Sequence, residues 1–210
     1  MKAFRHILLI GNGPDASPHL LKALARKADL LIAADGGADA ADRAGLYPDV
    51  VIGDLDSVSV QARRKFTQAR WIFVDDQQNT DLEKALHFLT NQKCKTCTLV
   101  GFTGGRMDFT IGNLLALYPY AKKLDLCIVS DGWKIFPINT AKTFTARPGT
   151  RVSLLPLKQC SGVTLDGLQF PLQNARLSFG TTRPLSNRAT KKRFSVSLRS
   201  GFLLVYLEDE

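Results

Sequence analysis

Short apolar runs alternate with segments of helical period along residues 1–133 of the chain. The runs that predict strands lie at 6–10, 29–33, 50–53, 71–74, 98–101 and 126–129. They are nearly continuous in apolar residues rather than alternating with polar ones, which is typical of strands buried on both faces of a parallel sheet. The pattern therefore predicts an α/β domain whose mostly parallel sheet is covered by helices on both faces.

The pattern of apolar residues changes over residues 134–210, where Gly and Pro recur between short apolar runs and no apolar stripe of helical period is found. The apolar runs of this second half lie at 133–138, 142–146, 151–155, 176–179, 193–198 and 202–207. Short strands at such spacing predict a β-sandwich or barrel. We expect a Rossmann-like parallel α/β domain over 1–133 and an all-β sandwich or barrel domain over 134–210.

Composition narrows the class of protein. With 210 residues, 45% of them hydrophobic, the chain can bury a core and is not disordered. Its apolar runs are far shorter than the roughly 20 residues that span a bilayer, and the N-terminus lacks the pattern of a signal peptide. We expect a soluble, cytoplasmic protein with no membrane partner. Four dispersed cysteines predict structural thiols rather than a disulfide framework or a zinc site.

The formal charge of +9 is concentrated in the second half of the chain. Residues 1–133 carry 16 basic and 15 acidic side chains, whereas residues 134–210 carry 12 and 4. Such a basic half could neutralise nucleic-acid phosphates. No helix-turn-helix, zinc-finger or aromatic ribonucleoprotein motif accompanies the charge, however, so we favour a solvated basic face and expect no nucleic-acid partner.

Four of the predicted strands lead directly into loops that carry aspartates. These aspartates are Asp35, Asp54, Asp56, Asp75, Asp76 and Asp108. Because the carboxyl ends of parallel strands meet at one edge of a sheet, these side chains should converge there. If 54–56 is extended, Asp54 and Asp56 project to the same side. Aspartates are also common in turns and at helix N-caps, so each one alone could be purely structural.

Ionised carboxylates that converge need a countercharge. At about 4 Å two of them repel by roughly 1 kcal/mol in water and by about 4 kcal/mol at a protein-like effective dielectric. A divalent cation is the natural countercharge. The ligands on offer are oxygens, and the three histidines are scattered through the sequence, so Mg²⁺ fits better than zinc.

Three segments have features of phosphate sites. In Asp35-Gly36-Gly37 the glycines could adopt positive φ or allow backbone N–H groups to approach a phosphate. Thr80 and Glu83 form a capping box, and the helix N-terminus that it opens can also bind phosphate. The segment 101–108 offers three glycines and Arg106, whose guanidinium matches phosphate oxygens, although a tight turn with a surface arginine would look the same.

Two familiar nucleotide motifs are excluded. The chain contains no G-x-x-x-x-G-K-[ST], so it is not a P-loop protein. The segment 11–16 formally fits the dinucleotide fingerprint, but Ser17 and Pro18 form a better helix start as N-cap and first helical residue. The loop is then too long for the third position of the fingerprint to lie in the helix.

Six segments together resemble the thiamine pyrophosphokinase family. They are ADGGAD (34–39), IGDLDSV (52–58), DQQNTDLEKAL (76–86), GFTGGRMDFTIGNL (101–114), GLQFPL (167–172) and LSN (185–187). The resemblance covers nearly the whole chain. It implies an N-terminal α/β domain, a C-terminal β-sandwich and a homodimer with the active site between subunits. The activity it implies is Mg²⁺-dependent transfer of pyrophosphate from ATP, the co-substrate, to thiamine, giving thiamine diphosphate and AMP.

The resemblance also implies roles for individual residues. Around Mg²⁺ and the ATP phosphates it places Asp54, Asp56 and Asp81 as metal ligands, with Asp35 and Gly36 nearby. The rest of that pocket would be Gln77, Thr80, Gly104, Gly105, Arg106, Asp108 and Asn113. Ser186 and Asn187 would hold thiamine, and Asp108 or Asp81 would accept the hydroxyl proton. The chain departs from the family at Arg188, where bacterial members commonly have Glu.

Two other function classes remain open from the sequence. One is a related Mg²⁺-dependent pyrophosphokinase that acts on another hydroxymethyl heterocycle such as a pterin. The other is a basic nucleic-acid-binding module. Release of AMP from ATP separates both kinases from the module, and the Ser186-Asn187 pair favours thiamine over a pterin.

Overall fold

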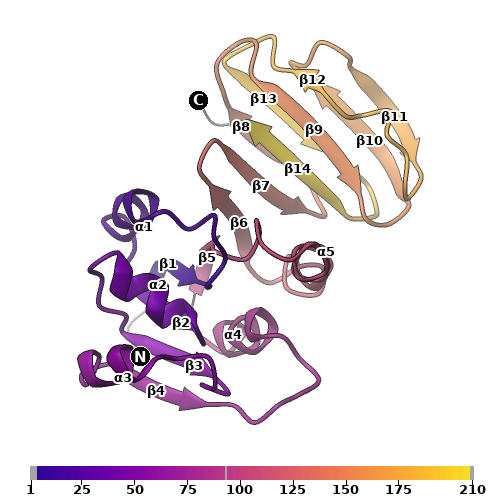
Figure 1. Ribbon diagram of the computed structural model, residues 1–210. Helices are drawn as coiled ribbons and strands as arrows, with labels where there is room; N and C mark the ends of the chain where they lie inside the picture. The colour runs from indigo at the N-terminus through magenta and orange to yellow at the C-terminus, as the bar shows by residue number, and fades with distance from the viewer. Residues whose placement is uncertain (1–3, 93, 209–210) are drawn as a thin grey trace. The chain divides into compact units, whose positions relative to one another are not determined.

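The computed structural model describes residues 4–92 and 94–208, and the chain divides into two compact units (Figure 1). Unit 1 is Met1–Asp131 and unit 2 is Gly132–Glu210, so the division falls two residues before the predicted boundary. Unit 1 holds a parallel sheet with helices, and unit 2 holds antiparallel strands. The mixed α/β class is thus confirmed, while the narrower descriptions of a Rossmann-like domain and a sandwich or barrel stay predictions.

The strands of unit 1 form a sheet in the order β6-β5-β1-β2-β3-β4, in which every neighbouring pair is parallel. Their bounds are β1 (Phe4–Ile10), β2 (Leu30–Ala34), β3 (Val50–Gly53), β4 (Arg70–Phe73), β5 (Cys94–Val100) and β6 (Asp125–Ser130). Strand β5 begins four residues before the predicted run. Cys94 and Cys97 are buried free thiols, and buried cysteine behaves as a small apolar residue that continues the strand.

The order of the strands reverses between β1 and β5. Strands β2 to β4 lie on one side of β1, whereas β5 and β6 lie on the other. Helix α2 contacts both α1 and α3, and α4 contacts α5. With right-handed crossovers, the first three helices cover one face of the sheet and the last two cover the other. Ligands of open α/β sheets bind beyond the carboxyl ends of the strands at such a reversal.

Two helices of unit 1 begin where their capping residues predict. The helix bounds in this unit are α1 (Pro18–Ala25), α2 (Gly37–Arg43), α3 (Val60–Lys65), α4 (Asp81–Thr90) and α5 (Met107–Ala116). Ser17 caps α1, with Pro18 as its first residue. At α4 the Thr80 hydroxyl accepts from the Glu83 N–H at 3.3 Å, and the Glu83 carboxylate accepts from the Thr80 N–H at 3.0 Å. This capping box fixes the start of α4 at the edge of the sheet.

The strands of unit 2 form two antiparallel sheets, β12-β9-β14-β7 and β11-β10-β13-β8. Their bounds are β7 (Trp133–Ile138), β8 (Lys142–Thr145), β9 (Arg151–Pro156), β10 (Cys160–Asp166), β11 (Leu172–Leu177), β12 (Asn187–Arg188), β13 (Arg193–Ser197) and β14 (Leu203–Glu208). Side chains of both sheets, such as Val152, Leu154, Val163 and Phe194, share one apolar core.

Two strands of unit 2 were not predicted, and a third begins earlier than expected. Strand β10 is irregular, with register shifts against β11 and a left-handed Gly162 at φ 65°, so its apolar alternation is broken. Strand β12 has only two residues, too few to form a pattern. Strand β11 begins at Leu172 rather than at 176, and the prediction misses its first residues because they are largely polar and exposed and form no apolar run.

None of the helices in the described part of the chain has the length and apolar character that a membrane span needs.

Candidate active site

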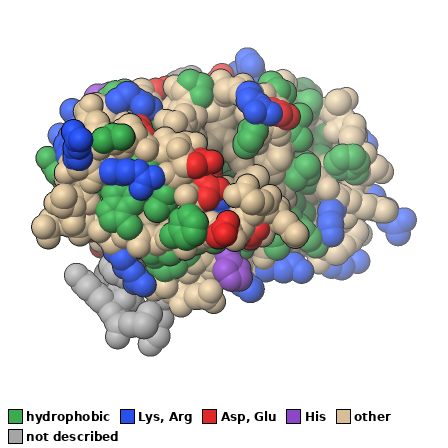
Figure 2. Space-filling view, turned by 60° about the horizontal axis from the view of Figure 1, so that its bottom comes forward, with side chains coloured by type: hydrophobic (Ala, Val, Ile, Leu, Met, Phe, Trp, Pro, Cys, Tyr) green, Lys and Arg blue, Asp and Glu red, His purple; other side chains and the backbone are tan. Residues whose placement is uncertain are grey.

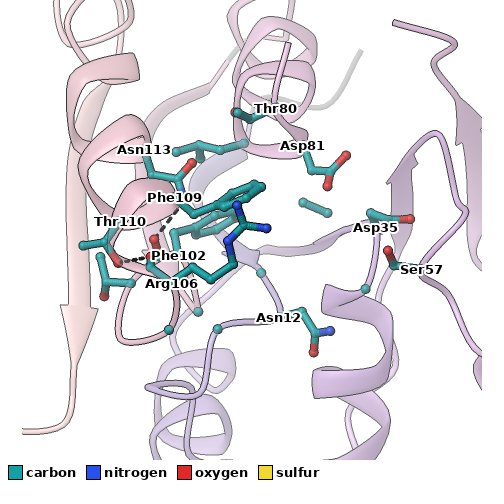
Figure 3. Close-up of a pocket in the computed structure, with 18 residues that line it drawn as sticks. Asn12, Asp35, Ser57, Thr80, Asp81, Phe102, Arg106, Phe109, Thr110 and Asn113 are labelled. Carbon is teal, nitrogen blue, oxygen red and sulfur yellow. Dashed lines mark hydrogen bonds between the residues drawn. The ribbon is translucent and has the colours of Figure 1, made fainter. Parts of the chain in front are cut away.

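The loops that follow β1, β2, β3 and β5 enclose a cleft of about 460 Å³, together with the starts of α4 and α5 (Figure 3). It lies where the strand order reverses, as the general rule for such sheets predicts. The predicted site residues that line it are Asp35, Gly36, Thr80, Asp81, Gly105, Arg106 and Asn113. Those outside its lining are Asp54, Asp56, Gln77, Gly104 and Asp108 in unit 1 and Ser186 and Asn187 in unit 2.

Close backbone contacts between the loops after β1 and β5 form one wall of the cleft. Gly11 N–H donates to the Val100 carbonyl at 2.8 Å, and Gly13 N–H donates to the Gly101 carbonyl at 2.7 Å. Gly101 has φ 78°, and a Cβ there would lie 2.4 Å from the Gly11 carbonyl oxygen. Only glycine fits this position, and the tight approach exposes backbone to the cleft.

Three carboxylates converge beside this cleft. One oxygen each of Asp35, Asp54 and Asp81 lies within 4.8 Å of the others. Asp35 follows β2 in the left-handed region (φ 44°) and is 3% exposed, and none of the described residues is a hydrogen-bond partner for its buried Oδ1. A buried carboxylate oxygen without a partner is costly and calls for a cation or a donor. We call these three residues the acidic cluster.

The acidic cluster differs from the predicted metal set, which held Asp56 where the structure brings Asp35. The idea that 54–56 is extended is wrong, because Leu55 has φ 63° and buries its side chain. Asp56 is exposed and accepts a hydrogen bond from the Ser57 hydroxyl at 3.0 Å. The turn expected at the glycines after Asp35 is also different: positive φ occurs at Asp35 itself, whereas Gly36 has φ −56°.

Lys84 supplies part of the countercharge that the sequence predicts from a metal alone. Its Nζ lies 2.7 Å from Asp54 Oδ2 and 3.2 Å from Asp81 Oδ1, and its side chain is 3% exposed. A signal was available in the sequence. Asp81 and Lys84 are three residues apart in a helix, so they share a face, and Lys84 adjoins the apolar stripe of α4.

The pKa values follow from these contacts. The hydrogen bond from Lys84 holds the pKa of Asp54 below its usual value. Burial, reinforced by the charge of Asp35, raises the pKa of Asp81. Burial alone would lower the pKa of Lys84, but the bonds and charges of Asp54 and Asp81 outweigh it and leave that pKa raised. Lys84 is therefore a charged ammonium at neutral pH.

The acidic cluster fits Mg²⁺. Its donors are all carboxylate oxygens, the ligands that Mg²⁺ prefers, and Asp35 offers an oxygen to which no residue in 4–92 or 94–208 donates a hydrogen bond. Three carboxylates against one ammonium leave a formal charge of −2, which one divalent cation would neutralise. The face shown in Figure 2 has acidic side chains gathered near its middle and basic ones spread around them.

Arg106 and Asp108, both predicted site residues, pair with each other. Arg106 Nη2 and Nε lie 2.6 and 3.1 Å from the two oxygens of Asp108, and the guanidinium carbon lies 4.5 Å from the centre of the Phe109 ring. Both side chains are largely exposed, and Arg106 extends toward the middle of the cleft in Figure 3. The hydrogen bond from Arg106 lowers the pKa of Asp108.

Asn113 and Gln77 occupy different surroundings. Asn113 is buried in α5, and its Nδ2 donates to the Phe102 carbonyl at 2.8 Å, which ties the glycine loop to the helix (Figure 3). Gln77 is exposed in the loop before α4 and does not line the cleft. That loop is organised by Asp76, whose carboxylate accepts from the Gln78 N–H at 2.8 Å.

The two residues assigned to thiamine lie in unit 2 and differ sharply. Ser186 is exposed at φ 56°, and its N–H donates to the Ser153 hydroxyl at 2.9 Å. Asn187 is 2% exposed. Its Oδ1 accepts from the Phe170 N–H at 3.0 Å, and its Nδ2 donates to the Phe170 carbonyl at 2.8 Å. The Asn187 amide thus uses its oxygen and its nitrogen to bind the backbone of Phe170, whose side chain is exposed.

Comparisons with known proteins agree with this geometry. Residues 21–128 match the thiamin pyrophosphokinase catalytic domain, and residues 138–203 match the thiamin pyrophosphokinase vitamin B1 binding domain. A thiamine pyrophosphokinase of Bacillus subtilis is 28% identical over 183 residues, which are 84% of this chain and 86% of that protein.

Solved structures show the same fold. The crystal structure of the Bacillus subtilis thiamine pyrophosphokinase superposes with a TM-score of 0.85 at 24% identity, covering 98% of this chain and 100% of that one. That of the Geobacillus thermodenitrificans thiamin pyrophosphokinase gives 0.81 at 25% identity, with 98% of each chain covered. Both domain matches and the motifs of the cleft lead to one conclusion: the chain belongs to the thiamin pyrophosphokinase family.

Proposed function

We propose that the cleft of unit 1 binds ATP with Mg²⁺, and that this family member there transfers the diphosphate group of ATP to the hydroxyl of thiamine. The products are thiamine diphosphate and AMP. The observation that carries the proposal is the acidic cluster with its unpartnered Asp35 oxygen at the strand reversal. The pterin and nucleic-acid alternatives find no support in the comparisons.

Asp35, Asp54 and Asp81 are the residues that would hold Mg²⁺. When bound there, the metal would supply positive charge to the phosphate oxygens of ATP. Asp56 is the residue next to Leu55. It is a candidate for a second contact with the metal or with the water molecules around the metal. Catalysis then rests on placing two substrates and neutralising charge, because phosphate transfer asks for little covalent chemistry from the protein.

The phosphates of ATP would contact three groups of this chain. The backbone of Gly104 and Gly105 lies in the loop after β5, the start of α4 offers N–H groups beside Thr80, and Arg106 offers a guanidinium fork. Asp108 holds that fork in place through two hydrogen bonds. Its lowered pKa keeps Asp108 ionised. It can therefore accept the hydrogen bond of the thiamine hydroxyl and orient it for attack on phosphorus.

Thiamine would be held by the segment that contains Ser186 and Asn187. Ser186 is exposed and can contact the substrate, whereas Asn187 is a positioning residue that fixes the segment around Phe170. The resemblance to the family supports a homodimer in which one subunit supplies the ATP cleft and its partner supplies Ser186.

Subunit mixing tests this arrangement. Asp54→Asn and Ser186→Ala each impair a different part of the site. If the two parts come from different subunits, random mixing of the two variant chains gives the parent's turnover and KM for thiamine at up to about a quarter of the sites. If both parts come from one subunit, mixing restores none of the activity, and the shared site is ruled out.

The activity is tested by incubating the full chain with thiamine, ATP and Mg²⁺ and separating the products. We expect equal amounts of AMP and thiamine diphosphate. Formation of ADP with thiamine monophosphate would contradict transfer of a diphosphate group, and turnover that survives removal of divalent metal by EDTA would contradict the metal site.

A further inference from the structure

Lys84 occupies the position in which a metal bound to the acidic cluster would also make its contacts. Its Nζ bonds one oxygen of Asp54 and one of Asp81, and both carboxylates belong to the cluster. We propose that Lys84 is a built-in counter-cation that competes with Mg²⁺ for Asp54 and Asp81, so that the metal enters the cluster together with ATP rather than ahead of it. This inference rests on the proposed Mg²⁺ site.

The ammonium is held firmly in the cluster. Lys84 lies one turn into α4, whose start is fixed by the Thr80 capping box and whose neighbouring Leu82 and Ala85 are buried. A lysine side chain that is 3% exposed is rare unless it is paired with acids. When the metal is absent, Lys84 therefore stays paired with the carboxylates of the cluster. It is not a surface side chain that contacts them only occasionally.

Charge decides the order of binding. A dication that approaches within about 4 Å of an ammonium is repelled twice as strongly as a monovalent ion would be. The metal alone must therefore overcome this repulsion and separate Lys84 from two carboxylates. ATP changes the balance, because its phosphate oxygens offer the ammonium new partners while the metal takes the carboxylates. The four-carbon stem of lysine has the rotatable bonds that such an exchange needs.

The proposed coupling between ATP and the metal acts through Lys84, so removing the ammonium tests it. If ATP strengthens metal binding by relieving Lys84, then removal of the ammonium should strengthen metal binding without ATP and reduce the further gain that ATP provides. A purely structural role makes the opposite prediction. If Lys84 only holds Asp54 and Asp81 in place, its removal leaves two carboxylates uncompensated, and metal binding stays the same or weakens.

The test measures binding of Mn²⁺ alone to the full chain, freed of metal and nucleotide, by titration calorimetry and by electron paramagnetic resonance. For Lys84→Met we expect affinity for Mn²⁺ to rise by about tenfold or more over the parent, because a neighbouring positive charge is gone. Lys84→Arg keeps the charge and should bind as weakly as the parent. Lys65→Met is the matched control: it removes a lysine that pairs with Asp42, and it should leave Mn²⁺ affinity unchanged.

Circular dichroism and thermal unfolding check that each variant folds, and Lys84→Gln provides the same loss of charge if Lys84→Met does not fold. Equal Mn²⁺ affinity in the parent and in either uncharged variant, abolished by Asp54→Asn, overturns the role of Lys84 while leaving the metal site intact. Weaker affinity in the uncharged variants overturns it as well. Mn²⁺ binding that is absent from all variants, or that is unaffected by Asp54→Asn, refutes the metal site and the inference together.

Discussion

The buried polar side chains of the two units differ in charge. Unit 1 buries two charged side chains among the described residues, Asp35 and Lys84, whereas the buried polar side chains of unit 2, such as Ser153 and Asn187, are neutral. Yet residues 134–210 hold the larger formal charge, with 12 basic and 4 acidic side chains. Burying a charge is costly unless it is paired, whereas exposed charge costs little. Local burial of charge, and not net charge, marks the site.

The same contrast extends to the backbone. In unit 1 the non-glycine residues with left-handed φ, Asp35 and Leu55, sit directly at the acidic cluster or next to it. In unit 2 Ser186 is left-handed beside Asn187, and Asn174 is left-handed within β11. Non-glycine residues rarely adopt this conformation, and at functional sites the strain is compensated by surrounding contacts. Unit 1 concentrates both the strain and the buried charge at one edge of its sheet.

The largest effects should come from the acidic cluster. Asp35→Asn and Asp54→Asn each remove a proposed metal ligand, and we expect the rate of AMP formation to fall by roughly 100-fold or more. Asn also tolerates the left-handed φ of Asp35, so folding should survive. Asp56→Asn removes a carboxylate outside the cluster, proposed only for a second contact with the metal or its water shell, so its loss should be smaller, below about tenfold. Equal losses in all three variants would mean that the cluster is not the metal site.

Arg106→Lys should have the next largest effect. The substitution keeps the charge but loses the planar guanidinium, which pairs with Asp108 through Nε and Nη2 and is proposed to bind phosphate with its other edge. We expect kcat/KM for ATP to fall by about 10- to 100-fold, in keeping with the loss of one charge-assisted bidentate contact. The KM for thiamine should stay close to that of the parent. Parent-like ATP kinetics would show that Arg106 is a surface arginine.

Unit 2 should respond to substitution mainly through stability. Asn187→Ala leaves two partly buried backbone groups of Phe170 without the Asn187 amide as partner, and should cost about 1–3 kcal/mol of unfolding free energy. Ser186→Ala changes an exposed side chain, so it should raise the KM for thiamine without lowering the thermal midpoint. Denaturant titration and steady-state kinetics on both variants check the pair. A stable Asn187→Ala variant would remove the positioning role.

The smallest effect concerns Asp15, a partly buried carboxylate of unit 1 whose Oδ2 accepts from the Thr103 hydroxyl and whose Oδ1 has no partner in the described part of the chain. Burial raises its pKa in the folded state. The carboxyl therefore contributes full stability below its unfolded pKa and loses it as pH rises through the folded pKa. Asp15→Asn removes this loss, so its thermal midpoint should gain on the parent as the pH rises above about 4, the usual pKa of an unfolded aspartate. A difference that is constant or shrinks over this range would contradict the burial effect.

The sequence predicts the sheet of unit 1 well because its central strands are largely buried and form nearly continuous apolar runs, and the more exposed edge strand β4 is apolar as well. It places the acids at the correct edge for the same reason, since Asp35 and Asp54 directly follow β2 and β3. It does not separate Asp35 from Asp56, because that depends on the left-handed turn at Leu55, a branched residue that gives no signal for positive φ. Lys84 was missed because a lysine in a helix is ordinarily a solvated residue.

The measurement that bears most directly on the acidic cluster is the position of a bound metal. Crystals of the full chain with Mn²⁺ and α,β-methylene-ATP, an analogue that cannot release AMP, should show an anomalous peak in contact with oxygens of Asp35, Asp54 and Asp81. Lys84 Nζ should then have left its position between Asp54 and Asp81. A metal bound elsewhere with the analogue in the cleft, or a cluster still closed on Lys84, would contradict this account of the site.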